Sequence, residues 1–171
     1  MAVYYWLDTG GENTNLQLFS LKQAKKYWEE IQADYENYGE FIPELKERSV
    51  FVLASLGLSI SQLLGQVNPN LSERVPSPGK IFNDFVDTNN IDPSLKKQFE
   101  EFVFYYDGCR HFGKTSGNIS YKKIDQLTFQ KAKECYEFGL KIWKIVIDVF
   151  RSEPSNELDE LDLDNLGAGY G

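Results

Sequence analysis

The sequence is poor in the side chains that most often bind metals or act as nucleophiles in small enzymes. It contains one histidine, His111, and two cysteines, Cys109 and Cys135. A structural zinc site needs four such ligands and a catalytic zinc site takes several, so both kinds of site are excluded. Cys109 and His111 stand two positions apart and would point in different directions from a helix, which argues against a thiol–imidazole dyad. We therefore expect no metal site and no cofactor.

Several short motifs and long apolar runs are also missing. There is no phosphate-binding loop, no dinucleotide fingerprint and no Gly-x-Ser-x-Gly elbow, which excludes the common nucleotide hydrolases, dehydrogenases and serine hydrolases. The longest apolar stretch, residues 50–64, is interrupted by serines and a glutamine and is too short to span a bilayer. No basic leader opens the chain, and two cysteines fit a reducing compartment. We expect a cytoplasmic protein without membrane association.

The composition is typical of one globular domain with an aromatic-rich core. The chain has 171 residues, of which 42% are hydrophobic and 15% aromatic. Apolar residues recur at spacings of three and four through most of it, as they do in amphipathic helices. We expect an all-α fold, an antiparallel bundle of four to five helices over residues 20–151. Residues 1–19 fit a small β-hairpin, with Leu16–Phe19 as its second strand, and residues 152–171 form an acidic tail.

Capping residues and prolines predict where most helices begin. Ser20, with Gln23 three residues later, predicts the start of the first helix. Pro43 predicts the first turn of the second helix, whose apolar positions alternate by three and four as in an interhelical seam. A short helix is expected over residues 80–87, and the Asp92-Pro93 pair starts the next one. The predicted seam of the second helix is formed by Val50, Leu53, Gly57, Ile60, Leu64 and Val67.

The last long helix is expected to be capped by Asp125, with a hydrophobic staple between Ile124 and Phe129. Its apolar residues form two rows, so its apolar face is unusually wide. Two explanations stay open: the helix is central in the bundle, or it is shared with a second subunit. The second explanation predicts a homodimer. The two rows are Ala132, Cys135, Tyr136, Trp143, Val146, Ile147, Phe150 and Phe138, Ile142, Ile145, Val149.

Charge is distributed unevenly along the chain. The stretch from Arg110 to Lys144 holds eight bases and three acids, whereas the residues after Arg151 hold six carboxylates and no base. Clustered cations bind polyanions by displacing counterions, so Lys114, Lys122 and Lys123 in a glycine-broken loop favour nucleic-acid binding. The simpler alternative is that the basic residues are the solvated face of a helix.

The acidic tail also has more than one explanation. Four leucines alternate with its carboxylates: Leu158, Leu161, Leu163 and Leu166. The tail is either a solubilising end, a segment that docks on a protein partner through residues 153–171, or a cover over the basic segment of the same chain.

The most unusual stretch is Tyr105–Lys114, where the only histidine directly follows an arginine. Arginine can hold a phosphate with two hydrogen bonds, and histidine acts as acid or base near neutral pH. Arg110 and His111 therefore suit metal-independent cleavage of RNA, in which the ribose 2′-hydroxyl attacks the adjacent phosphorus. Asp107 stands three and four residues before them, so ion pairs on the last turn of a helix are the alternative explanation.

The Arg110-His111 pair before a long final helix resembles the HEPN superfamily (higher eukaryotes and prokaryotes nucleotide-binding domains). Members of that superfamily are small helical bundles, often dimeric, from toxin–antitoxin and phage-defence systems, and many are metal-independent ribonucleases. Their motif is an arginine, an adjoining polar residue and a catalytic histidine four to six residues beyond the arginine. Here the positions expected for that histidine hold Thr115, Ser116 and Gly117.

The resemblance implies an RNA-binding domain of a toxin–antitoxin or phage-defence system. Arg110 and His111 would be its catalytic residues, and Lys114, Lys122 and Lys123 would bind RNA. As an enzyme it would be a metal-independent endoribonuclease with His111 as the base, whereas without cleavage it would be a degenerate RNA-binding member. The alternative function is a non-catalytic protein-interaction module, antitoxin-like or an adaptor, that uses the helical surface and the acidic tail. A small-molecule pocket in the aromatic core is a third class, to which no residue set points.

Overall fold

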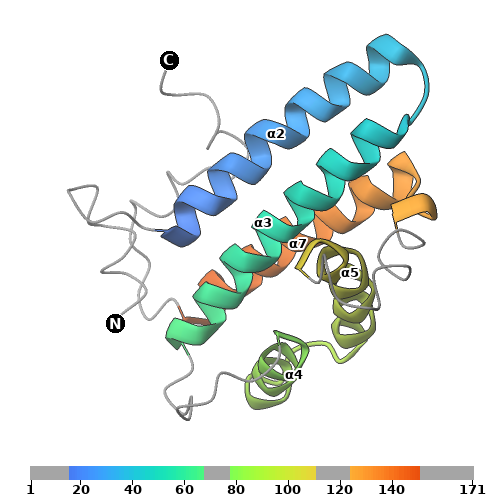
Figure 1. Cartoon of the computed structure of the whole chain (residues 1–171). Coiled ribbons are helices and arrows are strands. Elements are labelled where there is room, and N and C mark those ends of the chain that lie inside the picture. Colours follow the sequence, from blue (N-terminus) through green and yellow to red (C-terminus); the bar gives the residue numbers. More distant parts are fainter. Residues whose placement is uncertain (1–15, 68–77, 111–123, 151–171) are drawn as a thin grey trace.

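The computed structural model describes residues 16–67, 78–110 and 124–150 of the chain. These residues form a helical bundle and contain no strand, which confirms the predicted all-α fold (Figure 1). The helices are α2 (Leu16–Tyr38), α3 (Pro43–Val67), α4 (Pro78–Thr88), α5 (Ser94–Arg110) and α7 (Phe129–Phe150).

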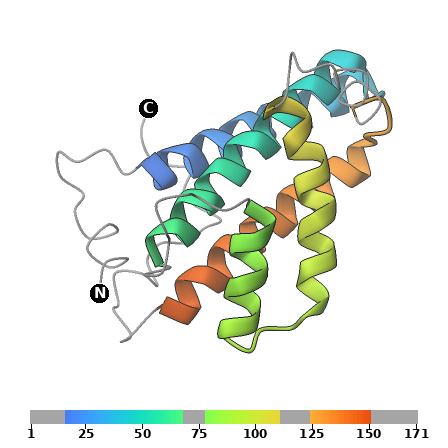
Figure 2. The same cartoon turned by 60° about the horizontal axis from the view of Figure 1, so that its bottom comes forward.

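Helix α3 is the central element of the bundle. Helix α2 lies antiparallel along one side of it, and α7 lies along the other side in the same direction as α3 (Figures 1 and 2). Helices α4 and α5 pair with each other and cross the other helices, as Figure 2 shows. Because this pair stands between α3 and α7 in the chain, α7 starts again at the end of the bundle where α3 starts.

The sequence of α3 explains its central position, because its apolar residues extend well beyond one seam. Four members of the predicted seam, Val50, Leu53, Ile60 and Leu64, are buried. The helix is also buried through Val52, Leu56, Leu63 and the small residues Ser49 and Ser59. An apolar surface this wide has to be covered from several sides.

Two contacts fix the crossing of α3 and α7. Gly139 of α7 lies so close to α3 that a Cβ atom there would overlap the side chain of Leu56 and stand 3.3 Å from Cε2 of Phe102 on α5. One turn further along, the indole Nε1 of the buried Trp143 donates a hydrogen bond of 2.8 Å to the Ser59 hydroxyl of α3. The polar end of the indole therefore has a partner inside the core, as buried tryptophans require.

Aromatic rings join α2 to the start of α7. Tyr35 stacks on Phe129 with ring centroids 3.8 Å apart, and Trp28 stacks on Tyr136 at 5.0 Å. Phe41, in the connection between α2 and α3, meets Phe129 edge to face at 5.6 Å. A second row of rings links α4, α5 and α7 and consists of Phe82, Phe99, Phe102 and Phe138.

The short connections are built from residues that the local backbone requires. Helix α2 ends at Gly39, whose φ of 71° lies in the left-handed region, and Pro43 then opens α3 as predicted. After α4, Asn90 adopts a φ of 53° and the amide of Ile91 bonds back to the carbonyl of Val86 at 3.0 Å. This pattern is the common left-handed end of a helix.

Helix α5 begins as predicted. The carboxylate of Asp92 accepts hydrogen bonds from the amide and the hydroxyl of Ser94, at 2.9 and 2.7 Å. Both bonds lower the pKa of Asp92, and the bond from the Ser94 hydroxyl has the larger effect. Lys96 also reaches back to Asp87 at 2.5 Å, which ties α5 to α4.

The predicted start of the first helix is wrong by one turn. Helix α2 begins at Leu16, so Ser20 lies within the helix and is buried instead of capping it. Leu16–Phe19 are helical and cannot be the second strand of a hairpin, because Leu21 and Ala24 extend a helical face that packs in the core. The first strand of that predicted hairpin, residues 2–7, lies outside the described residues.

The predicted cap of the last helix is also wrong. The Thr128 hydroxyl, not Asp125, accepts a hydrogen bond of 3.1 Å from the amide of Lys131, and α7 begins at Phe129. Ile124 starts a separate turn that the amide of Leu127 closes. Leu127 is fully buried, so the chain bends to insert it into the core before the long helix starts. Phe129 is then the first residue of the helix, and the staple that was expected around Asp125 does not form.

Most of the wide apolar face of α7 is covered within the chain, although Val149 near its end is exposed. Ala132, Cys135, Tyr136, Ile142 and Val146 are buried in the core that α7 shares with the other helices. This packing corresponds to the first of the two explanations for its width, and the homodimer stays a prediction. None of the helices in the described part of the chain is long and apolar enough to cross a membrane.

Candidate functional site

The predicted arginine–histidine site begins at the end of α5. Arg110 is the last residue of α5, and its helix ends near the start of α7 (Figure 2). The described residues do not include the side chain of Arg110. His111, Lys114, Lys122 and Lys123 lie outside the described residues altogether, so the proposed catalytic and RNA-binding roles stay predictions.

The lysines at the start of α7 are paired with carboxylates. Lys131 contacts Glu101 of α5 at 3.1 Å and Glu134 at 3.0 Å. Lys133 stands 3.9 Å from Glu137, one turn further along α7. Part of the positive charge that the sequence concentrates between Arg110 and Lys144 is therefore balanced locally. This finding agrees with the simpler explanation of these two lysines as a solvated helix face.

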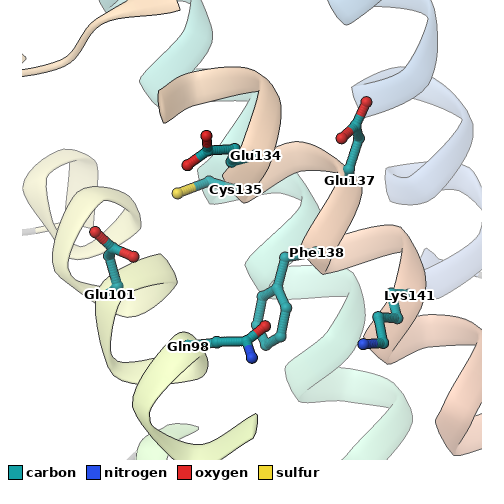
Figure 3. Close-up of a pocket in the computed structure, with 7 residues that line it drawn as sticks. All are labelled: Gln98, Glu101, Glu134, Cys135, Glu137, Phe138 and Lys141. Atoms are coloured by element: carbon teal, nitrogen blue, oxygen red, sulfur yellow. The ribbon is translucent and has the colours of Figure 1, made fainter. Parts of the chain in front are cut away.

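A shallow groove of about 430 Å³ lies between α5 and α7 (Figure 3). Helix α5 contributes Gln98 and Glu101, which face α7 across the groove. A second hollow of about 510 Å³ adjoins it on α5 and shares these two residues. The part of the groove that α7 contributes consists of Glu134, Cys135, Glu137, Phe138 and Lys141.

Hydrogen bonds favour the ionised forms of Glu134, which lines the groove, and of its partner Lys131. Glu134 accepts bonds from Gln130, at 3.1 Å, and from Lys131, and these bonds lower the pKa of its carboxyl group. The bonds of Lys131 to Glu134 and Glu101 raise the pKa of its ammonium group above the ordinary value. Neither group is left with a pKa near neutrality, which an acid–base catalyst needs.

Cys135 is the one thiol that the described residues place in the groove, and it is not activated. Burial raises the pKa of this thiol from 9.0 to about 12. Thiolate chemistry requires the opposite shift, so Cys135 is a small core residue rather than a nucleophile. No group of three metal-ligating side chains occurs among the described residues. The described part of the groove therefore offers neither an activated thiol nor a cluster of three metal ligands.

A different surface is unusual because large apolar side chains are exposed on it. Phe51 and Leu58 of α3 are 56% and 49% exposed, and Phe19 and Tyr27 of α2 are 52% and 37% exposed. Phe51 and Leu58 are seven residues apart, so they lie on the same side of α3. Tyr27 meets Phe51 edge to face with ring centroids 6.2 Å apart. We call Phe19, Tyr27, Phe51 and Leu58 the α2–α3 face.

The register of the two helices places these four residues along one stretch of the α2–α3 pair, which we call the band. Arg48 of α3 forms ion pairs with Asp34 at 2.6 Å and Glu30 at 3.6 Å, both on α2. These pairs and the contact of Tyr27 with Phe51 set an antiparallel register. In this register Phe19 lies at the level of Leu58. The band therefore runs beside the seam of α2 and α3, from the Arg48 ion pairs towards the start of α2.

Charge and an unused acceptor distinguish the end of the band near the start of α2. Lys22 and Lys26 follow Phe19 by three and seven residues, so they lie on the same side of α2 as its ring. On α3, Gln62 follows Leu58 by four residues and continues the line of the face. Among the described residues its Oε1 is buried without a hydrogen-bond partner. The face thus combines exposed apolar groups and cations, and the unpaired oxygen of Gln62 is enclosed beneath it.

The sequence contains a signal for this face in the apolar residues of α3 that lie outside its predicted seam. Phe51 and Leu58 are large apolar residues of α3 that do not belong to the predicted seam of this helix. In a helix with an assigned buried stripe, apolar residues at positions off the stripe are candidates for an exposed patch. Whether they were exposed depended on how far α2 covers α3, which is a property of the tertiary structure.

Comparisons of the chain with protein-family models, with curated proteins and with solved structures found no match. The resemblance to the HEPN superfamily consequently rests on Arg110, His111 and the helical layout.

Proposed function

We propose that this protein is a helical interaction domain that binds a segment of a protein partner through the α2–α3 face. The observation that carries the proposal is the exposure of Phe19, Tyr27, Phe51 and Leu58 in one band on two adjacent helices. Single exposed apolar residues are ordinary, whereas a contiguous patch with a polar border marks an interaction site. Burial of these half-exposed side chains by a partner would contribute to binding at about 25 cal/mol for each Å² of apolar surface.

The chemistry of the border favours an acidic partner segment that is rich in leucine. Lys22 and Lys26 lie beside Phe19, so carboxylates that flank the apolar residues of the partner would meet cations there. Complementary charge of this kind increases the rate and the specificity of association. Apolar residues of the partner would pack between the rings of Phe51 and Tyr27 and the side chain of Leu58. Docking of a short segment along a helical surface is a common mode of peptide recognition.

The other described surfaces offer weaker support for a site. Two carboxylates that line the groove between α5 and α7, Glu101 and Glu134, are already paired with Lys131. Its thiol, Cys135, has a pKa raised by burial. Among the described residues the groove therefore has no activated thiol.

A labelled acidic peptide provides the test. The probe is a fluorescein-labelled peptide with the sequence of residues 156–167, which contains four leucines and five carboxylates. The protein is the full chain with the four tail leucines replaced by serine, so that the tail does not compete. We expect saturable binding by fluorescence anisotropy, and a loss of affinity of about tenfold or more in Phe51→Asp and Leu58→Asp. Tyr38→Asp, at an exposed tyrosine outside the face, is the matched control and should bind normally.

The proposal would be refuted if the peptide failed to bind, or if Phe51→Asp and Tyr38→Asp bound it equally well. A peptide with its leucines replaced by serine separates apolar docking from simple charge attraction. We expect this second peptide to bind only at low salt, because screening removes contacts between exposed charges.

We propose RNA binding at the end of α5 as a second function, favoured by one observation. Arg110 is the last residue of α5, and the sequence between it and α7 contains His111 and three lysines. The test is incubation of end-labelled RNA in EDTA with the wild type, Arg110→Ala and His111→Ala. The matched control is Lys97→Ala, at an exposed lysine elsewhere on α5.

The outcomes of the RNA experiment separate the functions. Cleavage that is lost in both variants supports a metal-independent ribonuclease with His111 as the base. Binding without cleavage, lost in Arg110→Ala and weakened steeply between about 50 and 200 mM salt, supports a degenerate HEPN-like member. Absence of both cleavage and binding refutes the RNA function and leaves the interaction domain.

A further inference from the structure

We propose that the acidic C-terminal tail, residues 153–171, binds to the α2–α3 face of its own chain and competes there with partner segments. This inference rests on the proposed function of the face, and it adds a regulation of that site. A partner would have to displace the tail, so the affinity in trans would depend on the occupancy in cis. Three features favour the tail as the segment that occupies the face: the position of the end of α7, the length of the tail and its negative charge.

The tail departs from the correct end of the bundle. Helix α7 runs in the same direction as α3, and α2 runs in the opposite direction (Figure 1). The last residue of α7, Phe150, therefore lies at the end where α2 starts and α3 finishes. Phe19 and Leu58 occupy this half of the α2–α3 face. The basic connection after Arg110 begins at the opposite end of the bundle.

The tail is long enough to reach the face and to cover it. From Phe150 to Leu158, eight residues can span about 26 Å when extended, and adjacent helix axes stand about 8–10 Å apart. An extended segment of about 26 Å is long enough to cross about two helices. A path from the end of α7 to the outer side of α2 and α3 requires this length. Phe51 and Leu58 are separated by about 10 Å along α3. The leucines from Leu158 to Leu166 span at least that distance, either as a helix or as an extended chain.

The composition of the tail complements the face. Its six carboxylates and four leucines occur without a single Lys or Arg after Arg151. The face presents Lys22 and Lys26 beside its apolar groups, so the carboxylates of the tail would meet cations there. A cover over the basic connection is the competing position for the tail. It would require the tail to pass along the 22 residues of α7, about 33 Å, before it met that connection.

The tail and the face belong to one chain, which raises the concentration of the tail near the face. Short flexible linkers give effective concentrations in the millimolar range, so even weak docking in cis is populated. A free peptide displaces the tail when its concentration, divided by its dissociation constant, exceeds the effective concentration of the tail divided by the dissociation constant of the tail. The regulation therefore needs no conformational change of the bundle.

Site-specific photo-crosslinking of the full chain tests the position of the tail. Benzoylphenylalanine replaces Phe51 on the face or, in a matched control, Phe104 on α5, which is also exposed. After irradiation, gel electrophoresis separates monomers from linked pairs, and mass spectrometry identifies the attached peptide. We expect residues 153–171 to be linked from position 51 within the monomer, with a yield about tenfold above that from position 104. The combined variant Leu161→Asp and Leu163→Asp should lose this excess.

Each outcome decides the inference. Equal yields from both positions, or links to the tail of a second copy in the dimer band, overturn docking in cis. If position 51 links an added peptide of residues 156–167 but never the attached tail, the inference fails while the proposed function of the face stands. If position 51 links neither the tail nor the peptide, both fail. Links to the tail that persist in the Leu161→Asp and Leu163→Asp variant also refute the inference, because the leucines would not be the anchors.

Discussion

The effect of Gly139→Ala on the free energy of unfolding should change sign when Leu56 is shortened to alanine. In the wild type a Cβ at position 139 overlaps the side chain of Leu56, which is fully buried, and lies 3.3 Å from Phe102. Overpacking of a core lowers the free energy of unfolding by about 2 kcal/mol, and the better helix propensity of alanine raises it by about 1 kcal/mol. We therefore expect Gly139→Ala to destabilise the protein by about 1 kcal/mol.

In a Leu56→Ala background the obstacle is gone. Leu56→Ala alone should cost about 2–5 kcal/mol, because it leaves a cavity at the crossing of α3, α5 and α7. Gly139→Ala should then stabilise the protein by about 1 kcal/mol, since the new methyl group fills part of the cavity and the helix gains propensity. The free energy of coupling between the two sites is therefore about 2 kcal/mol.

Urea denaturation followed by circular dichroism at the helical minimum measures the four free energies of unfolding of this cycle. The matched control is Gly79→Ala in α4, where no atom lies within 4 Å of the added Cβ. This control should show no coupling with Leu56→Ala. If Gly139→Ala stabilised the wild type as it does the shortened background, α3 and α7 would not approach each other at this glycine, and the central crossing of the fold would be wrong.

Three further predictions follow from single contacts. Ser59→Ala removes the acceptor of the Trp143 indole and should lower the free energy of unfolding by about 1–3 kcal/mol, because a buried donor is left unsatisfied. Thr128→Ala should cost about 1 kcal/mol through loss of the cap of α7, as measured by thermal or urea unfolding. The Cys135 thiol, whose pKa rises from 9.0 to about 12 on folding, should make the protein less stable by about 1.4 kcal/mol between pH 8 and pH 10. The sign follows because the unfolded thiol loses its proton in this range while the folded thiol keeps it.

Each of these three has its own control. Ser55→Ala removes a hydroxyl that bonds to the carbonyl of Phe51 on the outer side of α3, and should cost less than Ser59→Ala. Asp125→Ala should leave the start of α7 intact, and a cost equal to that of Thr128→Ala would restore the cap predicted from the sequence. Cys135→Val should remove the thiol part of the loss of stability between pH 8 and pH 10. An unchanged slope in that variant would show that other groups cause it.

The two proposed functions use opposite features of the chain. Binding at the α2–α3 face depends on apolar groups and should survive moderate salt, whereas RNA binding at the end of α5 depends on cations and should not. Lys131 and Lys133 at the start of α7 already have carboxylate partners, which favours the interaction domain over RNA binding by these two lysines. Docking of the tail in cis would make this interaction conditional on displacement of residues 153–171.

The sequence by itself determined the helical class of this protein and most of its helices. Apolar spacings of three and four, Pro43 at a helix start and Asp92 before another are local signals, and the structure agrees with them. Local signals failed at Ser20 and Asp125, where equally good capping residues were present but burial of neighbouring residues decided the helix ends. Packing free energy of a buried residue such as Leu127 exceeds the small preference of one cap over another.

Only the tertiary structure decided which apolar residues are core and which are surface. Phe51 and Val52 are neighbours on α3, yet one is 56% exposed and the other fully buried, because α2 and α7 cover different sides of the helix. The pairing of Lys131 with Glu101 joins residues thirty positions apart on two helices and could not be read from a charge count. Periodicity fixes the angular position of a side chain on its own helix, but the neighbours that cover it come from distant parts of the chain.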